Sequence, residues 1–121
     1  MRGLGELEAV VMGVLWDGAR PMTVREVRED LAPARPLAYT TVMTVLDNLH
    51  GKGWTSRERD GRAWRYRPVQ TRAEAGAQAL RDVLDASGDP EQVLLHFTRT
   101  IGAEESALLR RVLGRESRGE R

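Results

Sequence analysis

Residues 38–68 read AYTTVMTVLDNLHGKGWTSRERDGRAWRYRP, and the spacing of the apolar residues changes within this stretch. In its first part, apolar residues recur at steps of three and four, as on one face of a helix: Val42, Val45, Leu46 and Leu49. Gly51 and Gly53 end the pattern, because glycine readily supplies the left-handed residue at a helix end. The pattern predicts a helix from about Ala38 to His50.

The second part of the stretch has the alternation of a β-hairpin. Two short runs, residues 54–59 and 62–67, are joined by Asp60-Gly61, a dipeptide that favours a two-residue turn. The aromatic side chains of the second run share one face, because neighbouring residues of a strand point to opposite sides. The stretch therefore predicts a helix followed directly by a two-stranded ribbon.

Two further helices are expected ahead of this stretch. The apolar face of the first consists of Leu4, Leu7, Val11, Val14 and Leu15. The second opens with a capping box, in which the Thr23 hydroxyl and the Glu26 carboxylate each accept from a backbone amide. Pro33 and Pro36 then require a turn, because proline does not fit a helix interior. Three helices followed by a hairpin is the order of a winged helix-turn-helix.

Beyond Val69 the sequence predicts helices alone. A capping box starts the first of them at Thr71, Ser87-Gly88 interrupts it, and Asp89-Pro90 starts the second. The expected inward residues of the first are Ala73, Ala77, Leu80 and Leu84. Gly102 is expected to end the second helix and Gly114 the third, which leaves residues 115–121 as a frayed, charged tail.

The fold class is therefore mainly α, with two domains. Residues 1–69 are expected to form the winged helix-turn-helix, of three helices plus a β-hairpin wing. Residues 70–121 are expected to form a C-terminal region of three helices that ends in the frayed tail.

Composition excludes several classes of function. The chain of 121 residues has no Cys, so disulfides, thiolate metal sites and Cys nucleophiles are excluded. His50 and His96 have no metal-ligand companion at helical spacing, and no catalytic motif is present. We expect no enzyme, no metal and no cofactor. No apolar run is long enough for a membrane span, so we expect a soluble, cytoplasmic protein without membrane insertion.

Positive charge is concentrated on the predicted hairpin. The whole chain has a net charge of +1, whereas residues 51–70 contain six basic and two acidic side chains. Binding to nucleic-acid phosphates needs such a concentration, since each contact releases condensed counterions. An ordinary solvated hairpin would explain the same charges, but the three preceding helices favour DNA. The residues expected to grip phosphates are Arg57, Arg59, Arg62 and Arg65.

The outward face of the third helix is rich in threonine. A Thr hydroxyl can contact phosphates or base edges, and its methyl group can meet a thymine methyl. Threonine is a mediocre helix former, so its abundance on a free surface favours a function in contact. Asp47 would be repelled by phosphate and is expected to face a cation such as Arg28 or Arg35. The residues expected to contact DNA are Tyr39, Thr40, Thr41, Met43, Thr44 and Asn48.

The C-terminal helices suggest a homodimer. Three short helices with one apolar face each cannot bury those faces within about fifty residues. A two-fold dimer would cover each face with its own copy, and two winged helices on a palindrome would multiply the discrimination. The alternative is a helical cap packed on the winged helix of the same chain. The expected interface residues are Leu80, Val83, Leu84, Val93, Leu94, Phe97, Ile101, Leu108, Leu109 and Val112.

These segments resemble the BlaI/MecI-type penicillinase repressors, a family that also includes copper-responsive repressors. The matching segments are residues 4–16, 39–49, 52–54, 60–66, 95–97 and 102–113. In that family they correspond to the first helix, the recognition helix, the wing and the dimerisation helices. The resemblance covers nearly the whole chain.

The resemblance implies a homodimer on DNA operators upstream of β-lactamase or related envelope-stress genes. It also implies release of repression when a membrane sensor-protease, or a protease downstream of it, causes cleavage in the C-terminal domain. In staphylococcal members the cleaved bond precedes a Phe that aligns with Phe97, so the implied bond joins His96 and Phe97, with His96 in place of their Asn. The copper branch uses a pair of Cys residues, which this chain lacks.

Two other functions fit the same elements. A winged-helix repressor could respond to a small molecule bound between its domains, or a winged helix could serve protein interaction without DNA. The amino-acid sequence by itself specifies neither the operator, nor the regulated genes, nor the inducing signal.

Overall fold

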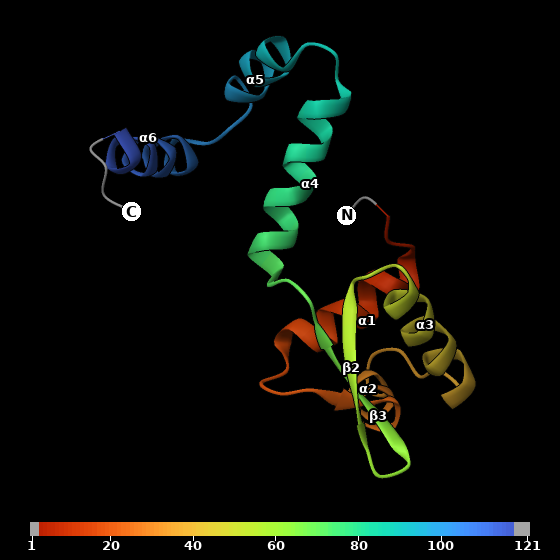
Figure 1. Ribbon diagram of the computed structural model, residues 1–121. Coiled ribbons are helices and arrows are strands. Elements are labelled where there is room, and N and C mark those ends of the chain that lie inside the picture. The colour runs from red at the N-terminus through yellow and green to blue at the C-terminus, as the bar shows by residue number, and fades with distance from the viewer. Residues whose placement is uncertain (1–2, 118–121) are drawn as a thin grey trace. The chain divides into compact units, whose positions relative to one another are not determined.

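The computed structural model describes residues 3–117. Over this range the elements in chain order are α1 (Glu6–Asp17), β1 (Met22–Thr23), α2 (Val24–Leu31), α3 (Tyr39–Gly51), β2 (Thr55–Asp60), β3 (Ala63–Pro68), α4 (Arg72–Ala86), α5 (Pro90–Thr98) and α6 (Ala103–Ser117) (Figure 1). The chain divides into two compact units, the first ending at Ala79 and the second beginning at Leu80. The mainly α fold class, with a winged helix followed by C-terminal helices, is confirmed.

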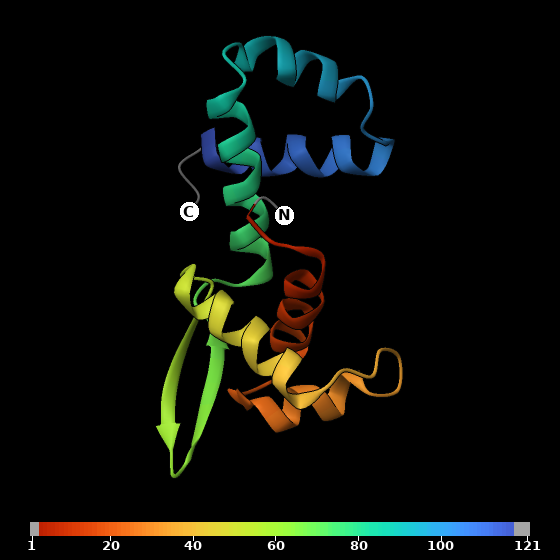
Figure 2. The ribbon, with the colours of Figure 1, turned by 90° about the vertical axis from the view of Figure 1, so that its right-hand side faces the viewer.

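The core of the first unit is formed by α1, α2, α3 and the sheet. Helix α3 buries the apolar stripe predicted for it, and one strand residue, Tyr66 of β3, joins the same cluster. The buried cluster consists of Val11, Met12, Leu15, Val24, Val27, Leu31, Val42, Val45, Leu46, Leu49 and Tyr66. Figure 2 shows α1, α2 and α3 grouped together, with the β2–β3 hairpin extending beside α3.

The hairpin forms as predicted, but its turn is displaced by one residue. Asp60 pairs with Ala63 in the ladder, so the two loop residues are Gly61 and Arg62 rather than Asp60 and Gly61. Gly61 has φ +62°, and no non-glycine residue among those described has positive φ. A positive φ at the first loop position alone is the pattern of a type II′ turn, for which glycine is the usual residue.

The sheet contains a third strand that the sequence analysis missed. Strand β1 pairs antiparallel with β3, through Met22 opposite Tyr66 and Thr23 opposite Arg65, and the strand order is β1-β3-β2. Two residues are too few to show an alternation, which is why periodicity gave no signal. The pairing closes one side of β3, so the inner strand of the wing is fixed to the start of α2.

Both predicted helix signals around α2 and α3 are confirmed. The Thr23 hydroxyl accepts from the Glu26 amide at 3.2 Å, and the Glu26 carboxylate accepts from the Thr23 amide at 2.9 Å. At the end of α3 the Trp54 amide donates to the Leu49 carbonyl at 2.9 Å, while Gly53 adopts φ +84°. This is the Schellman arrangement, so Gly53 is the left-handed residue while the helix runs one residue longer than predicted.

The expected inward face of α4 is wrong in its first turns. The capping box at Thr71 forms, but Ala75 is the buried residue and Ala73 and Ala77 are exposed. The indole Nε1 of Trp16 donates to the Gln70 carbonyl at 3.0 Å. Helix α4 therefore begins next to a segment that is hydrogen-bonded to α1, and Ala75 is the residue of α4 that is buried.

The second unit consists of helices whose ends differ from those predicted. Asp89 caps α5 as expected, accepting from the Gln92 amide at 3.2 Å. Helix α5 ends at Thr98, and Gly102 instead precedes α6, where its carbonyl accepts from the Ser106 amide. Helix α6 continues through Gly114 to Ser117, because glycine does not have to stop a helix. The expected fray is therefore wrong for residues 115–117, and residues 118–121 lie outside the described part.

Candidate nucleic-acid interface

Helix α3 presents a polar outward face opposite its buried stripe. Thr40, Thr44 and Asn48 are exposed and follow one another at intervals of four residues, which places them in one line along the helix. Tyr39 and Met43, also exposed, form a second line beside it. Of the six α3 residues predicted to contact DNA, Thr41 alone is half-buried. The remaining five form a continuous exposed surface.

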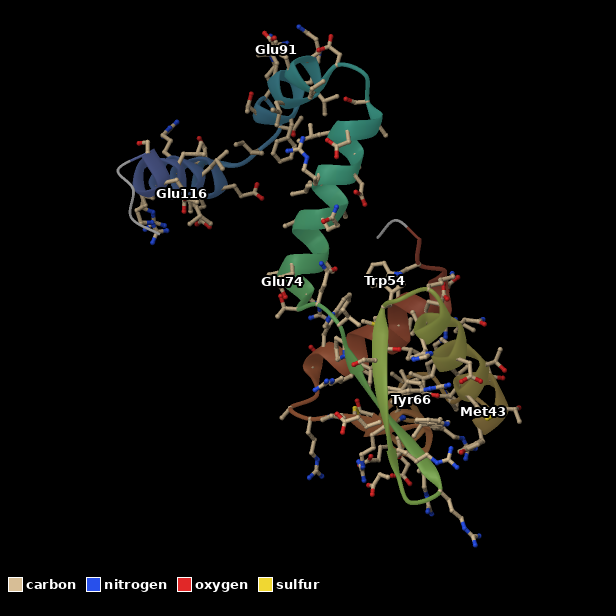
Figure 3. All side chains as sticks on the ribbon, viewed as in Figure 1. Met43, Trp54, Tyr66, Glu74, Glu91 and Glu116 are labelled. Atoms are coloured by element: carbon tan, nitrogen blue, oxygen red, sulfur yellow. The ribbon has the colours of Figure 1, made fainter. Side chains whose placement is uncertain are left out.

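A groove of about 1020 Å³ separates this helix from the hairpin. Its walls come from the start of α2, the second line of α3 and the inner face of the hairpin. The lining includes Arg25, Tyr39, Met43, Arg57 and Arg62. Figure 3 shows Met43 on α3 and Tyr66 on the hairpin, with nitrogen-bearing side chains extending from the hairpin's far end. The threonine-bearing helix and the arginine-bearing hairpin are therefore neighbours in space.

Arg65 makes several contacts within the protein. Its Nε donates to Asp60 at 2.6 Å, and its Nη1 donates to Glu26 at 2.8 Å. The hydrogen bond to Asp60 is the main cause that raises the pKa of Arg65. The pKa of Glu26 is lowered, first by the hydrogen bond from the Thr23 amide and also by the charge of Arg65. Arg65 thus connects the outer face of the hairpin to the start of α2.

Arg57 lies on the opposite face of the hairpin and is held against α3. Its Nη1 donates to Asp47 at 3.2 Å, and its guanidinium carbon lies 4.4 Å from the ring centroid of Trp64. At that distance the cation is attracted to the face of the indole. The expectation that Asp47 faces Arg28 or Arg35 is therefore wrong, because this side of α3 faces the folded-back hairpin.

Arg28 and Arg35 have other partners. Arg28 Nε donates to the Leu37 carbonyl at 2.9 Å, and Arg35 pairs with Glu6 at 3.4 Å. Arg28 lines the same groove as Asp47, but the hydrogen bond of its Nε goes to Leu37 and not to Asp47. The positions of Arg28, Arg35 and Arg57 in the sequence do not show which of them pairs with Asp47.

Arg59 and Arg62 are the hairpin arginines that remain accessible. Arg62 occupies the turn and is exposed, and within residues 3–117 neither side chain forms an ion pair. Arg59 lies over Trp64, 4.9 Å from the ring centroid, which orients the side chain without neutralising its charge. These two guanidinium groups are therefore available to an external anion.

Lys52 contributes less to the basic surface than its charge suggested. Its Nζ donates to the Glu8 carboxylate at 2.7 Å and to the Gly3 carbonyl at 3.2 Å. Glu8 is 7% exposed, and its pKa is lowered chiefly by the hydrogen bond from Lys52 and also by the one from the Gly5 amide. Arg25, which lies within the capping box and lines the groove, is a cation that the sequence did not single out.

The residues predicted for a dimer interface lie in or next to the second unit with their apolar surface uncovered. Leu84, Val93 and Ile101 are half-buried, and the other seven are exposed. Phe97 is 48% exposed and Leu108 50%. In the described chain, neither α5 nor α6 contains a buried residue. The predicted cleavage residues, His96 and Phe97, are both exposed on α5.

Among the described residues there is neither a metal-binding cluster nor a membrane-spanning helix. Between residues 3 and 117, no group of three or more His, Asp or Glu side chains is arranged to hold a metal ion. Each helix in that range is too short or too polar to cross a bilayer.

Comparison with known proteins gives two consistent sequence matches. A family profile described as penicillinase repressor matches residues 4–115. The transcriptional regulator BlaI of Mycobacterium tuberculosis is 47% identical over 113 residues, which cover 91% of this chain and 82% of that protein. Because these relatives are transcriptional regulators, the expectation that the chain is not an enzyme is confirmed.

Solved structures share the fold. The DNA-binding domain of the repressor BlaI is 25% identical, with a TM-score of 0.53, and the match covers 60% of this chain and 87% of that domain. RosR of H. salinarum is 19% identical, with a TM-score of 0.53, and covers 98% of this chain and 97% of its own. The second likeness concerns the fold alone.

Proposed function

The chain belongs to the penicillinase repressor family, and we propose that it represses transcription as a homodimer bound to a palindromic DNA operator. In this proposal α3 enters the major groove, and the β2–β3 hairpin lies along the neighbouring phosphates. One arrangement supports it most: Tyr39 and Met43 of α3 line the same groove as the hairpin arginines Arg57 and Arg62.

The two lines of α3 have different parts in the proposed complex. Thr40, Thr44 and Asn48 form the line that contacts base edges, where a hydroxyl, a methyl group or an amide can discriminate between bases. Tyr39 and Met43 contact the side of the DNA major groove that is nearer the hairpin. The half-buried Thr41 is better suited to a phosphate than to a base, because phosphates lie at the edge of the groove.

The wing arginines supply most of the sequence-independent affinity. Arg59 and Arg62 each neutralise one phosphate, since their charges have no acidic partner among residues 3–117. Arg57 and Arg65, which the sequence analysis also expected at phosphates, contribute mainly by holding the hairpin in place. Their ion pairs with Asp47 and Glu26 would have to open before either could bind DNA.

The second unit pairs two copies through its uncovered apolar faces. Full burial of one Leu, Val or Phe side chain contributes about 1.5–3 kcal/mol, so even partial burial of these residues favours association. We propose that residues 1–69 form the DNA-binding domain and that the helices of residues 70–121 form the dimerisation domain. Two recognition helices about 34 Å apart would then meet successive major grooves.

Cleavage in the C-terminal region would release the operator. A cut between His96 and Phe97 would separate α6 and the end of α5 from the rest of the chain. Both residues are exposed but helical, so local unfolding of α5 has to precede cleavage. The regulated genes in this proposal are those of β-lactamase or a related envelope-stress response.

The test starts from the purified full chain and a library of random duplexes. Rounds of selection should enrich an inverted repeat whose half-sites are about one helical turn apart, and sedimentation should show a dimer at micromolar concentration. Footprinting would then locate the protected bases. A monomeric protein that enriches no inverted repeat over random duplex would contradict the proposal.

A further inference from the structure

Asp47 is an unexpected residue for a DNA-facing groove. It lies on α3 one turn beyond Met43, it lines the groove, and its side chain is 53% exposed. A carboxylate at such a place repels the phosphates of an approaching duplex. Considered alone, Asp47 should therefore weaken DNA binding.

The contacts of Asp47 suggest a different effect. One oxygen, Oδ1, accepts from Arg57 Nη1 at 3.2 Å and from the Tyr66 hydroxyl at 3.2 Å. Arg57 Nη1 also donates to the Tyr66 hydroxyl at 3.3 Å. The three groups thus close a triangle of hydrogen bonds, with one member each from α3, β2 and β3.

The two members of this triangle that belong to the hairpin, Arg57 and Tyr66, are held in place by packing. Tyr66 is 1% exposed and belongs to the core, while Arg57 lies directly opposite it in the ladder. The guanidinium of Arg57 lies over both Trp64 and Tyr66, at 4.4 and 5.9 Å from the ring centroids. Arg57 is therefore fixed by two aromatic rings before Asp47 is considered, and Asp47 joins this assembly to α3.

Among the described elements, the side-chain hydrogen bonds that join α3 to the hairpin run through this carboxylate. The other ion pairs of the hairpin run along its outer face, from Arg65 to Asp60 and Glu26 and from Arg67 to Glu58. Those pairs orient the hairpin against α2 or within itself. Asp47 instead provides side-chain hydrogen bonds directly between the recognition helix and the wing.

We infer that Asp47 is a positioning residue, which holds the wing at the angle to α3 that DNA requires by binding Arg57 and Tyr66. The inference rests on the proposed function. It means that a negative charge at the DNA interface increases operator affinity, because the correct placement of Arg59 and Arg62 outweighs the repulsion of one exposed carboxylate.

The deciding variant is Asp47→Asn, which keeps the shape and removes the charge. Operator affinity should fall about 3- to 10-fold, because the neutral amide oxygen accepts from Arg57 and Tyr66 more weakly than the carboxylate does. The slope of log K against log salt should become shallower, because Arg59 and Arg62 are then less well placed to neutralise their phosphates. If the carboxylate only repels DNA, the same variant should bind more tightly.

Glu58→Gln is the matched control. Glu58 also lies in the hairpin and is 72% exposed at its side chain, but it faces the outer side and pairs with Arg67. Removing its charge should leave affinity equal or slightly higher. A loss of affinity equal to that of Asp47→Asn would mean that the effect is not specific to the network.

A double-mutant cycle shows whether Asp47 acts through Arg57. In the Arg57→Gln background, Asp47→Asn should have almost no further effect on affinity, whereas independent effects would multiply. Tyr66→Phe, which removes only the hydroxyl, should reproduce part of the loss and provides the test if Asp47→Asn folds poorly. Circular dichroism at the assay temperature verifies that each variant is folded.

The outcomes separate this inference from the proposed function. If the unchanged protein selects no inverted repeat, the proposed function fails. If it binds an operator, and Asp47→Asn binds as tightly or more tightly, the inference fails while the function stands. Multiplicative losses in the double variant would also overturn it.

Discussion

Arg62 and Arg65 stand three residues apart in the hairpin, yet their guanidinium groups have different surroundings. Arg62 occupies the turn and contacts no described acidic group, whereas Arg65 bonds to Asp60 and Glu26. An exposed, unpaired arginine can neutralise a phosphate at little cost, while a paired one first has to break its bonds. The two residues should therefore respond differently to the same substitution.

Arg62→Ala should weaken operator binding and reduce the slope of log K against log salt by about 0.9, the share of one phosphate contact. Its thermal midpoint should not change. Arg65→Ala should instead lower the thermal midpoint of unfolding, since it removes partly exposed ion pairs with Asp60 and Glu26. Anisotropy titrations at several salt concentrations and thermal melts measure both effects. An unchanged slope for Arg62→Ala would place the wing tip away from the phosphates.

Glu8 should make stability depend on pH in the acid range. Its folded-state pKa lies below the ordinary value of 4.5, chiefly because Lys52 donates to it. The ionised carboxylate therefore stabilises the fold above pH 4.5, and this contribution is lost as the pH falls through the lowered pKa.

Glu8→Gln removes this contribution and tests its sign. At neutral pH the variant should be less stable by about 1–3 kcal/mol, because Lys52 and the Gly5 amide then donate to a neutral oxygen instead of a charged one. The difference from the unchanged protein should shrink steadily as the pH falls below 4.5. Thermal melts between pH 7 and about pH 3 provide the comparison. A difference that stays constant with pH would exclude Glu8 as its source.

At the scale of the element, the end of α3 illustrates how two nearby glycines can have opposite effects on stability. Gly53 has φ +84°, the left-handed conformation that closes the helix, whereas Gly51 is helical. At both positions an added Cβ would meet no atom within 4 Å. Any difference between them therefore comes from the backbone and not from crowding.

Gly53→Ala should lower the free energy of unfolding by about 1 kcal/mol, since alanine is strained at positive φ. Gly51→Ala should raise it by about 0.5–1 kcal/mol, because alanine favours the helix and restricts the unfolded chain. Urea denaturation of the pair measures both values. Equal changes at the two positions would contradict the assigned end of α3.

The elements that the sequence predicted are those with a repeated or local signal. The apolar period of α3 and the capping box at Thr23 depend on residues within one or two turns, and both are confirmed. Strand β1 and the inward side of α4 depend on partners more than forty residues away, such as Tyr66 for Met22 and Trp16 for Gln70. Such contacts leave no period in the chain, so they could not be predicted from it.

In the candidate site, too, the features with a local signal were predictable and those that depend on distant contacts were not. The exposed face of α3 was predictable, because it is the complement of a regular apolar stripe. The separation of the hairpin arginines into bonded and accessible groups was not, since it depends on the distances of Arg57 to Asp47 and of Arg65 to Glu26. The same holds for Lys52, whose charge is taken up by Glu8.

At the scale of the whole molecule, the proposed affinity depends on coupling two weak half-sites. One winged helix contacts few base pairs, whereas two helices held together bind the second half-site at a high effective concentration. The exposed apolar residues of α5 and α6 would supply the connection, although they contact no base themselves. A substitution far from the DNA should therefore abolish binding.

Phe97→Asp should convert the dimer into a monomer, because burying an unpaired carboxylate against an apolar partner costs several kcal/mol. Operator affinity should fall at least about 100-fold, since each half-site then binds separately. Sedimentation and gel-shift titrations measure the two effects, and a melt verifies that the first unit stays folded. Glu91→Gln, at an exposed polar position of the same helix, should change neither. A dimeric Phe97→Asp protein would exclude this face from the interface, and a monomer with full affinity would mean that a single winged helix is enough for the operator.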